Sequence, residues 1–237
     1  MVFPPPNRYH PAVMTRNPSV ESDRRPLRSR ELPVFRALAD AMSRRGVSPN
    51  AISVGGMIAG IAAGCALVST ACPRVPASAA WILGAVLVQL RLLANMLDGM
   101  VAIASGRASA VGEIYNEIPD RVSDTAVLVG LGYAAGGDPV LGYAAALAAM
   151  FTAYVRAMGK AAGTVQCFDG PMAKPQRMFL TTIVALYAGI APSGWQPVCP
   201  VHPGLGLPAA VLAVILAGSL VTAVRRLRKI ASALRAG

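Results

Sequence analysis

The chain has 237 residues, of which 54% are hydrophobic and only 14% are charged. Soluble domains carry about 25% charged residues, so this composition excludes an ordinary soluble domain and indicates an α-helical integral membrane protein. The net charge is +11, but aromatic residues make up only 5% and the basic residues gather in tails and loops. That distribution is typical of membrane orientation and argues against nucleic-acid binding.

The first 47 residues precede the apolar stretches. Residues 1–30 are rich in Pro and Arg and contain no apolar run, which predicts a disordered basic tail rather than a signal peptide. Residues 31–47 place Val34, Phe35, Leu38 and Met42 on one helical face, away from the arginines. This pattern predicts a juxtamembrane amphipathic helix that lies on the membrane surface and contacts anionic lipids.

Residues 48–230 are expected to form one transmembrane domain. The spans are predicted at residues 50–70, 79–103, 110–135, 139–161, 177–193 and 205–225. Lys and Arg are frequent in the tails and in alternate loops, whereas the opposite loops hold only Arg74. The predicted fold is therefore an all-α integral membrane protein, with six transmembrane helices preceded by an amphipathic surface helix and both termini cytoplasmic.

Two smaller features leave alternatives open. Gly56, Gly60 and Gly64 form a row that permits close helix contact, either inside the chain, which we favour, or at a homodimer seam. Cys72 and Cys199 fall in loops on the same side of the membrane, where two unpaired thiols are favoured over a disulfide.

Five of the 11 acidic residues lie in one stretch at the edges of apolar segments. They are Asp98, Glu113, Glu117, Asp120 and Asp124. Helical periodicity puts Arg91, Asn95 and Asp98 on one face of the second span, and residues 113–124 place a polar stripe on the third. Solvated helix ends would explain Glu113 and Arg107, but Asp98 lies within an apolar run. Intramembrane carboxylates also occur in ion or proton transporters, although no internal repeat supports that alternative.

Two facing stripes of carboxylates and amides would repel each other in a dry site unless cations lie between them. Hard divalent cations such as Mg²⁺ prefer oxygen ligands and bridge carboxylates to phosphates. Gly99 and Gly112 flank the stripes and would let a phosphate approach the backbone, with free N–H groups near the start of the third span.

These residues resemble a known signature. The pattern Asn95-x2-Asp98-Gly99-x2-Ala102-x9-Gly112-x3-Asn116-x3-Asp120 matches the spacing of the CDP-alcohol phosphotransferase motif, D-x2-D-G-x2-A-R-x8-G-x3-D-x3-D. The upstream SPNAISVGG resembles the family's entry to its first span, and AYVRAMGKAAG resembles the corresponding stretch of the phosphatidylinositol-phosphate synthase branch.

The resemblance implies a metal-dependent membrane transferase of phospholipid biosynthesis. Such an enzyme, in the inner membrane of a bacterium, moves a phosphatidyl or other substituted phosphate group from CDP-diacylglycerol or another CDP-alcohol to an alcohol, and CMP leaves. By position in the motif, Asp120 is the general base, and Mg²⁺ or Mn²⁺ is held by Asp98, Asp120, Asn95 and Asn116. Gly99, Ala102, Gly112, Arg107 and Asn50 would contact the donor. An anionic acceptor such as a phosphorylated polyol would contact Arg156, Lys160, Lys174 and Arg177.

The chain departs from the signature at three positions. Asn95 and Asn116 stand where the family has aspartates that hold two metal ions, and Ile103 stands where it has arginine. Glu117 is the favoured substitute ligand, and Arg107 or Arg91 could replace the lost positive charge. A degenerate family member with altered donor, altered metal use or no catalysis is the alternative that these departures leave open.

Overall fold

The computed structural model describes residues 32–107, 110–164, 167–200, 202 and 204–236. The expected basic tail, residues 1–30, lies outside the described part. Seven α-helices are described: α2 (Pro33–Arg44), α3 (Pro49–Ser69), α4 (Ala77–Ala104), α5 (Ala110–Tyr133), α6 (Pro139–Ala161), α7 (Lys174–Ile190) and α8 (Leu207–Ala236). A short 3₁₀ helix, η2 (Ser193–Trp195), lies between α7 and α8.

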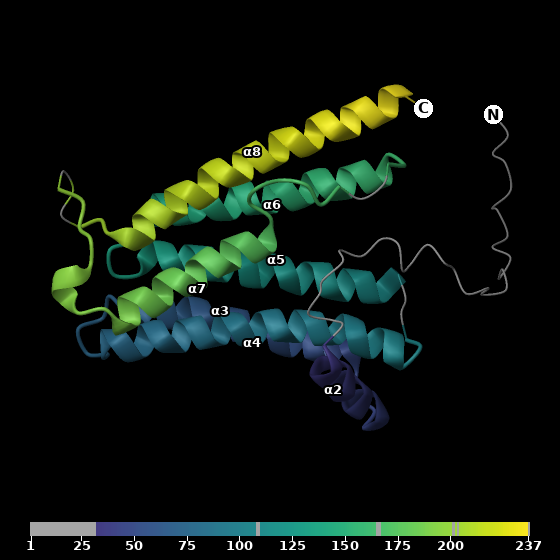
Figure 1. The fold of residues 1–237 in the computed structure, drawn as a ribbon, viewed down its shortest axis with the longest axis horizontal. Coiled ribbons are helices and arrows are strands. Elements are labelled where there is room, and N and C mark those ends of the chain that lie inside the picture. Colours follow the sequence, from purple (N-terminus) through teal and green to yellow (C-terminus); the bar gives the residue numbers. More distant parts are fainter. Residues whose placement is uncertain (1–31, 108–109, 165–166, 201, 203, 237) are drawn as a thin grey trace, which may run out of the picture.

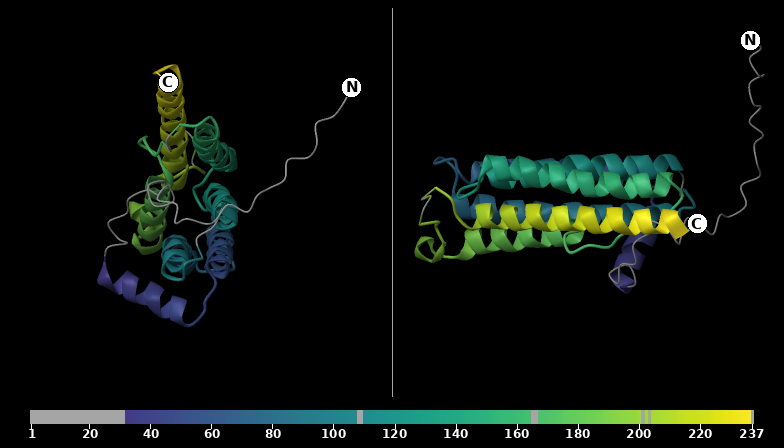
Figure 2. Two further views of the ribbon diagram at one scale, coloured as in Figure 1. Left: turned by 90° about the vertical axis from the view of Figure 1, so that its right-hand side faces the viewer. Right: turned by 90° about the horizontal axis from the view of Figure 1, so that it is seen from above.

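Helices α3 to α8 run alongside one another as an elongated bundle, and α2 lies across one end of it (Figures 1 and 2). Helix α3 packs on α4 and α5, α5 on α6, and α6 on α8. Helix α7 packs mainly on α4, and α2 also packs on α4. The all-α membrane architecture predicted from the sequence is confirmed.

The bundle has an apolar surface and charged residues in its interior, which is the reverse of the arrangement in a soluble protein. Large hydrophobic side chains such as Ile58, Leu147 and Phe179 are exposed, whereas Arg91, Asp98 and other charged side chains are buried. Lipid tails solvate an apolar exterior, and costly charged groups in a membrane protein face the bundle interior.

Among the described helices, α3, α4, α6 and α8 are long and apolar enough to cross a membrane. Helix α5 contains several charged residues, and α7 has only 17 residues. The structure therefore supports an integral membrane protein, while the count of six spans stays a prediction.

The glycine row on α3 packs inside the chain, as favoured from the sequence. Gly56, Gly60 and Gly64 are buried. An added Cβ at Gly56 would lie 2.9 Å from Ala94 Cβ on α4, and one at Gly64 would lie 2.9 Å from the Ala126 carbonyl carbon on α5. These close approaches let both α4 and α5 pack directly against α3. All four cysteines are free, so Cys72 and Cys199 are not bridged.

Helix α7 begins well inside the length of the bundle, because the chain turns back after α6 before α7 starts (Figure 1). This explains why α7 is shorter than its neighbours. It also places Lys174 and Arg177, in the first turn of α7, beside the acidic residues of α5.

Candidate active site

Asp98 lies at the centre of the site, in the interior face of α4. The residue is 3% exposed. Ser53 of α3 donates a hydrogen bond from Oγ to Asp98 Oδ2 at 2.7 Å. The other carboxylate oxygen, Oδ1, is buried and has no hydrogen-bond partner among the described residues. Asp98 therefore offers one oriented oxygen to a ligand.

Two amide oxygens are likewise buried without a hydrogen-bond partner in the described part of the chain. They are Asn95 Oδ1 on α4 and Asn116 Oδ1 on α5. Leaving a buried oxygen without a partner costs about 1–3 kcal/mol. A divalent cation, which prefers oxygen ligands, would satisfy all three atoms. The donor set thus fits a hard metal ion.

No group of three or more His, Cys, Asp and Glu that could hold a metal is found in the described residues. The reason is visible in the sequence, because two of the four motif positions are asparagine. Any ion at this site has fewer charged ligands than the four-aspartate pattern provides.

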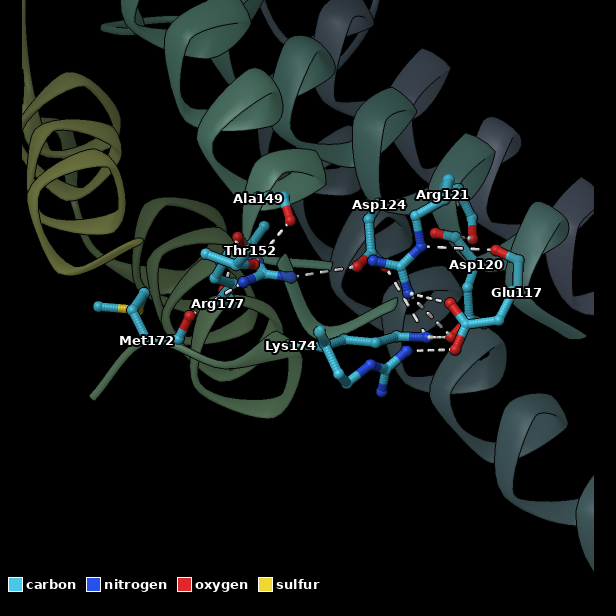
Figure 3. Close-up of polar contacts among 12 residues, drawn as sticks. Glu117, Asp120, Arg121, Asp124, Ala149, Thr152, Met172, Lys174 and Arg177 are labelled. Carbon is cyan, nitrogen blue, oxygen red and sulfur yellow. Dashed lines mark hydrogen bonds and ion pairs between the residues drawn. The ribbon is translucent and has the colours of Figure 1, made fainter. Parts of the chain in front are cut away.

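Asp120 on α5 is surrounded by positive charge (Figure 3). Its Oδ1 pairs with Arg91 Nη2. Its Oδ2 lies 2.7 Å from Lys174 Nζ and 3.7 Å from Arg121 Nη2. Both carboxylate oxygens are therefore engaged, and the charge of Asp120 is balanced by neighbours on α4 and α7.

Arg91 is held rigidly between α4 and α5. Its Nε donates to Ser123 Oγ at 2.6 Å, and that hydroxyl donates to the Pro119 carbonyl, also at 2.6 Å. The arginine is 2% exposed. Its guanidinium therefore has a fixed position in the site.

Asp124, one turn further along α5, pairs with the start of α7 (Figure 3). Arg177 Nη2 lies 3.5 Å from Asp124 Oδ2, and Arg177 Nη1 donates to the Met172 carbonyl at 2.9 Å. Lys174 Nζ lies 3.9 Å from Asp124 Oδ1. Arg177 is buried, so its main contacts fasten α7 to α5.

Glu117 lies on the more open side of the site. Its side chain is 49% exposed and pairs with Arg156 of α6 and, at 3.3 Å, with Arg121. The Arg156 guanidinium also lies over the Phe168 ring, 5.5 Å from its centroid. Glu117 therefore forms an ion pair with Arg156, which was predicted from the sequence to bind the acceptor.

Helix α8 fixes the segment that precedes α7. Arg226 donates from Nε to the Asp169 carbonyl at 2.9 Å and from Nη1 to the Thr152 carbonyl at 2.8 Å. The Met172 amide donates to Thr222 Oγ1 at 3.0 Å. Lys229 pairs with the exposed Asp169 carboxylate and lowers its pKa. These contacts set where α7 begins and so where Lys174 lies.

Known proteins share both the sequence and the fold. The phosphatidylinositol phosphate synthase of Streptomyces avermitilis is 31% identical over 201 residues, which cover 81% of this chain and 76% of that protein. The chain belongs to the CDP-alcohol phosphotransferase family. The phosphatidylinositol phosphate synthase of Cutibacterium acnes is 30% identical and covers 82% of this chain and 90% of its own length. No protein-family model matches the chain.

The fold of this family member matches solved structures of the Mycobacterium tuberculosis phosphatidylinositol phosphate synthase. One, with CDP-DAG bound, has a TM-score of 0.66 at 21% identity and covers 84% of this chain and 94% of that one. Another, with manganese and citrate, has a TM-score of 0.64 at 22% identity, over 83% and 88% of the two chains. The family consists of membrane-embedded transferases of substituted phosphate groups that use a divalent metal, so the predicted enzyme class is confirmed and the transporter alternative is disfavoured.

Only some of the site residues predicted from the sequence lie in the interior of the bundle. Asp120 on α5 pairs with Arg91 of α4, one turn before Asn95, and the motif side chains of Asn95, Asp98 and Asn116 are buried or half-buried. Gly99, Ala102 and Gly112 lie half-buried on the same two helices. Asn50 is half-buried in the first turn of α3. Arg107, just after α4, and Lys160, near the end of α6, are exposed. The side chain of Glu113 lies outside the described part.

Three residues that support the site could not be recognised from the sequence. Ser53, Thr222 and Arg226 act through contacts with segments distant in sequence, which a helical pattern does not reveal. Polar residues within an apolar helix are the one signal that marks Ser53 and Thr222. Arg226 sits in a cationic stretch that reads as an orientation signal.

Proposed function

We propose that this chain transfers the phosphatidyl group of CDP-diacylglycerol to the hydroxyl of a phosphorylated inositol, with release of CMP. The relatives named above are synthases of phosphatidylinositol phosphate, and one solved relative holds CDP-DAG. The observation that carries the proposal is the set of three buried, unpartnered oxygens of Asn95, Asp98 and Asn116 beside a cluster of cations.

The donor's diphosphate would lie against these oxygens. Asp98, Asn95 and Asn116 would hold Mg²⁺ or Mn²⁺, and that ion, when bound, would supply the positive charge that stabilises the leaving CMP. Gly99, Ala102 and Gly112, half-buried on α4 and α5, would lie against the nucleotide, and Asn50 and Arg107 stay candidates for contact with the donor.

The acceptor would enter next to Asp120. Lys174, at the start of α7, and Arg156, on α6, would bind its phosphate, with Lys160 and Arg177 nearby as further charges. When Lys174 turns to that phosphate, Asp120 Oδ2 becomes free to accept the proton of the attacking hydroxyl. The new bond forms between the acceptor oxygen and the lipid-side phosphorus, while the bond from that phosphorus to the bridging oxygen of CMP breaks.

A lipid product assay tests this proposal. Protein in nanodiscs receives CDP-diacylglycerol, Mg²⁺ and one acceptor at a time: inositol phosphate, inositol, or glycerol phosphate. Inositol phosphate should give equal amounts of CMP and a phosphatidyl product identified by mass spectrometry. Product with glycerol phosphate alone would change the acceptor, and absence of CMP with every acceptor would favour a non-catalytic family member.

Glu117 distinguishes a metal ligand from a residue that positions Arg156. Because its contacts in the structure are with Arg156 and Arg121, we expect Glu117→Gln to raise the KM for the acceptor about two- to fivefold and to leave the Mg²⁺ requirement unchanged. Steady-state kinetics at varied acceptor and varied Mg²⁺ measure the two effects separately. A large rise in the Mg²⁺ concentration for half-maximal rate would instead make Glu117 the substitute ligand predicted from the sequence.

We propose that the site opens to the cytoplasm. The C-terminal end of α8 and α2 lie at the same end of the bundle, and the basic loops favour that end for the cytoplasm (Figure 1). A membrane-impermeant thiol reagent added outside cells should label Cys199 in a Cys72→Ser background and should not label Ser232→Cys in a Cys72→Ser/Cys199→Ser background. Labelling at position 232 from outside would reverse the orientation.

A further inference from the structure

The donor site has lost negative charge compared with its family's pattern, and a buried arginine, Arg91, contacts one of the two motif carboxylates that remain. Positions 95 and 116 are amides, so Asp98 and Asp120 are the remaining motif carboxylates. Of these two carboxylates, Asp98 alone has a buried oxygen without a hydrogen-bond partner in the described part of the chain. Both oxygens of Asp120 face cations, Arg91 on one side and Lys174 on the other.

The position of Arg91 beside Asp120 is fixed by its neighbours. It lies one helical turn before Asn95 on α4, and its guanidinium is permanently charged. The bond from Nε to Ser123 Oγ fixes its orientation. A Cβ at Gly60 would lie 3.3 Å from Arg91 Cγ and 3.1 Å from Ser123 Cα, so the glycine leaves the space that this arrangement uses.

The cations of the site already outnumber its carboxylates before any ligand binds. Three carboxylates, Glu117, Asp120 and Asp124, form ion pairs with five cations, which are Arg91, Arg121, Arg156, Lys174 and Arg177, and Asp98 adds a fourth carboxylate. The diphosphate of a CDP-linked lipid brings two negative charges, and one divalent cation cancels them. A second divalent cation would add positive charge that no carboxylate in this network offsets, next to a guanidinium that already contacts Asp120.

We propose that this site binds one divalent cation, at Asn95, Asp98 and Asn116, and that the Arg91 guanidinium takes the place of the second metal ion of the family's pattern. The inference rests on the proposed function, because it assumes a CDP-linked donor in this site. It explains why two amides and a buried arginine occur together: the arginine supplies the charge that two further carboxylates would otherwise have attracted as metal.

Metal counting tests the inference without relying on turnover. Purified protein in nanodiscs containing CDP-diacylglycerol is titrated with Mn²⁺, and free Mn²⁺ is followed by electron paramagnetic resonance, with protein-free nanodiscs as the blank. Wild-type protein should bind one Mn²⁺ per chain. The Asn95→Asp/Asn116→Asp variant should stay at one, because Arg91 is still present. Adding Arg91→Gln to that variant should raise the number to two.

Each departure from those numbers overturns the inference. Two Mn²⁺ in the wild type, two in the variant that keeps Arg91, or one in the triple variant would show that Arg91 does not replace a metal. Arg91→Met serves in the same background if the glutamine version does not fold, as judged by gel filtration. If the wild type binds no Mn²⁺ but releases CMP, the inference fails and the proposed function stands. If it neither binds Mn²⁺ nor releases CMP, both fail.

Discussion

Asp120→Asn is expected to lower the rate of phosphatidyl transfer by about 10²–10⁴-fold, the usual contribution of a positioned general base. The amide keeps the shape of the side chain but cannot accept the proton of the attacking hydroxyl. It also weakens the pairing with Arg91 and Lys174, which adds to the loss. The rate of CMP release at saturating donor and acceptor measures the effect.

The affinity for the donor distinguishes the loss of a general base from the disruption of the whole site. Asp120→Asn should bind CDP-diacylglycerol with an affinity close to that of the wild type, since the unpartnered oxygens of Asn95, Asp98 and Asn116 are untouched. Arg121→Gln is the matched control, because Arg121 also faces Asp120 but at 3.7 Å and on the more exposed side. Near-normal turnover in Asp120→Asn would assign the base to another group.

Asp98→Asn should produce a comparable loss through the metal. It removes the one carboxylate among the three ligand oxygens and leaves three amides, which bind a hard cation weakly. We expect the rate to fall at least about 10²-fold at ordinary Mg²⁺ concentrations and to recover in part when Mg²⁺ is raised. The rate as a function of Mg²⁺ concentration provides the measurement.

Ser53→Ala should have a smaller effect of the same kind as Asp98→Asn. The serine donates to Asp98 Oδ2 and so orients the other oxygen. Loss of such a supporting bond typically costs about 10–100-fold in metal affinity or activity. A Mg²⁺ dependence in Asp98→Asn that equals the wild type would exclude Asp98 as a ligand.

Helix positions were predictable because a membrane limits the choices. The apolar stretches and the loops between them place the ends of α3 to α7 within three residues of the structure. Helix α8 is the exception. It was expected to stop near residue 225 and continues to Ala236, because the cationic stretch that follows is made of good helix formers and leaves the apolar region without breaking the helix.

The helices that carry the motif were predictable from the sequence, whereas the charge pairing of the acidic residues was not. Spacing along the chain placed Asn95 and Asp98 on α4 and Asn116 and Asp120 on α5, where all four are buried or half-buried. The pairing of Lys174 with Asp120 depends on where α7 begins, which contacts from α8 decide. In the sequence alone, Lys174 and Arg177 are equally well explained as orientation signals of a cytoplasmic loop.

The most direct measurement is an experimental structure of this protein with CDP-diacylglycerol and Mn²⁺, in which anomalous scattering locates the metal. We expect a single Mn²⁺ in direct contact with Asp98 Oδ1, with the amide oxygens of Asn95 and Asn116, and with the donor's diphosphate. We also expect Arg91 still to contact Asp120. A metal ion held by Glu117 or Asp124, or a diphosphate bound away from α4 and α5, would contradict this arrangement.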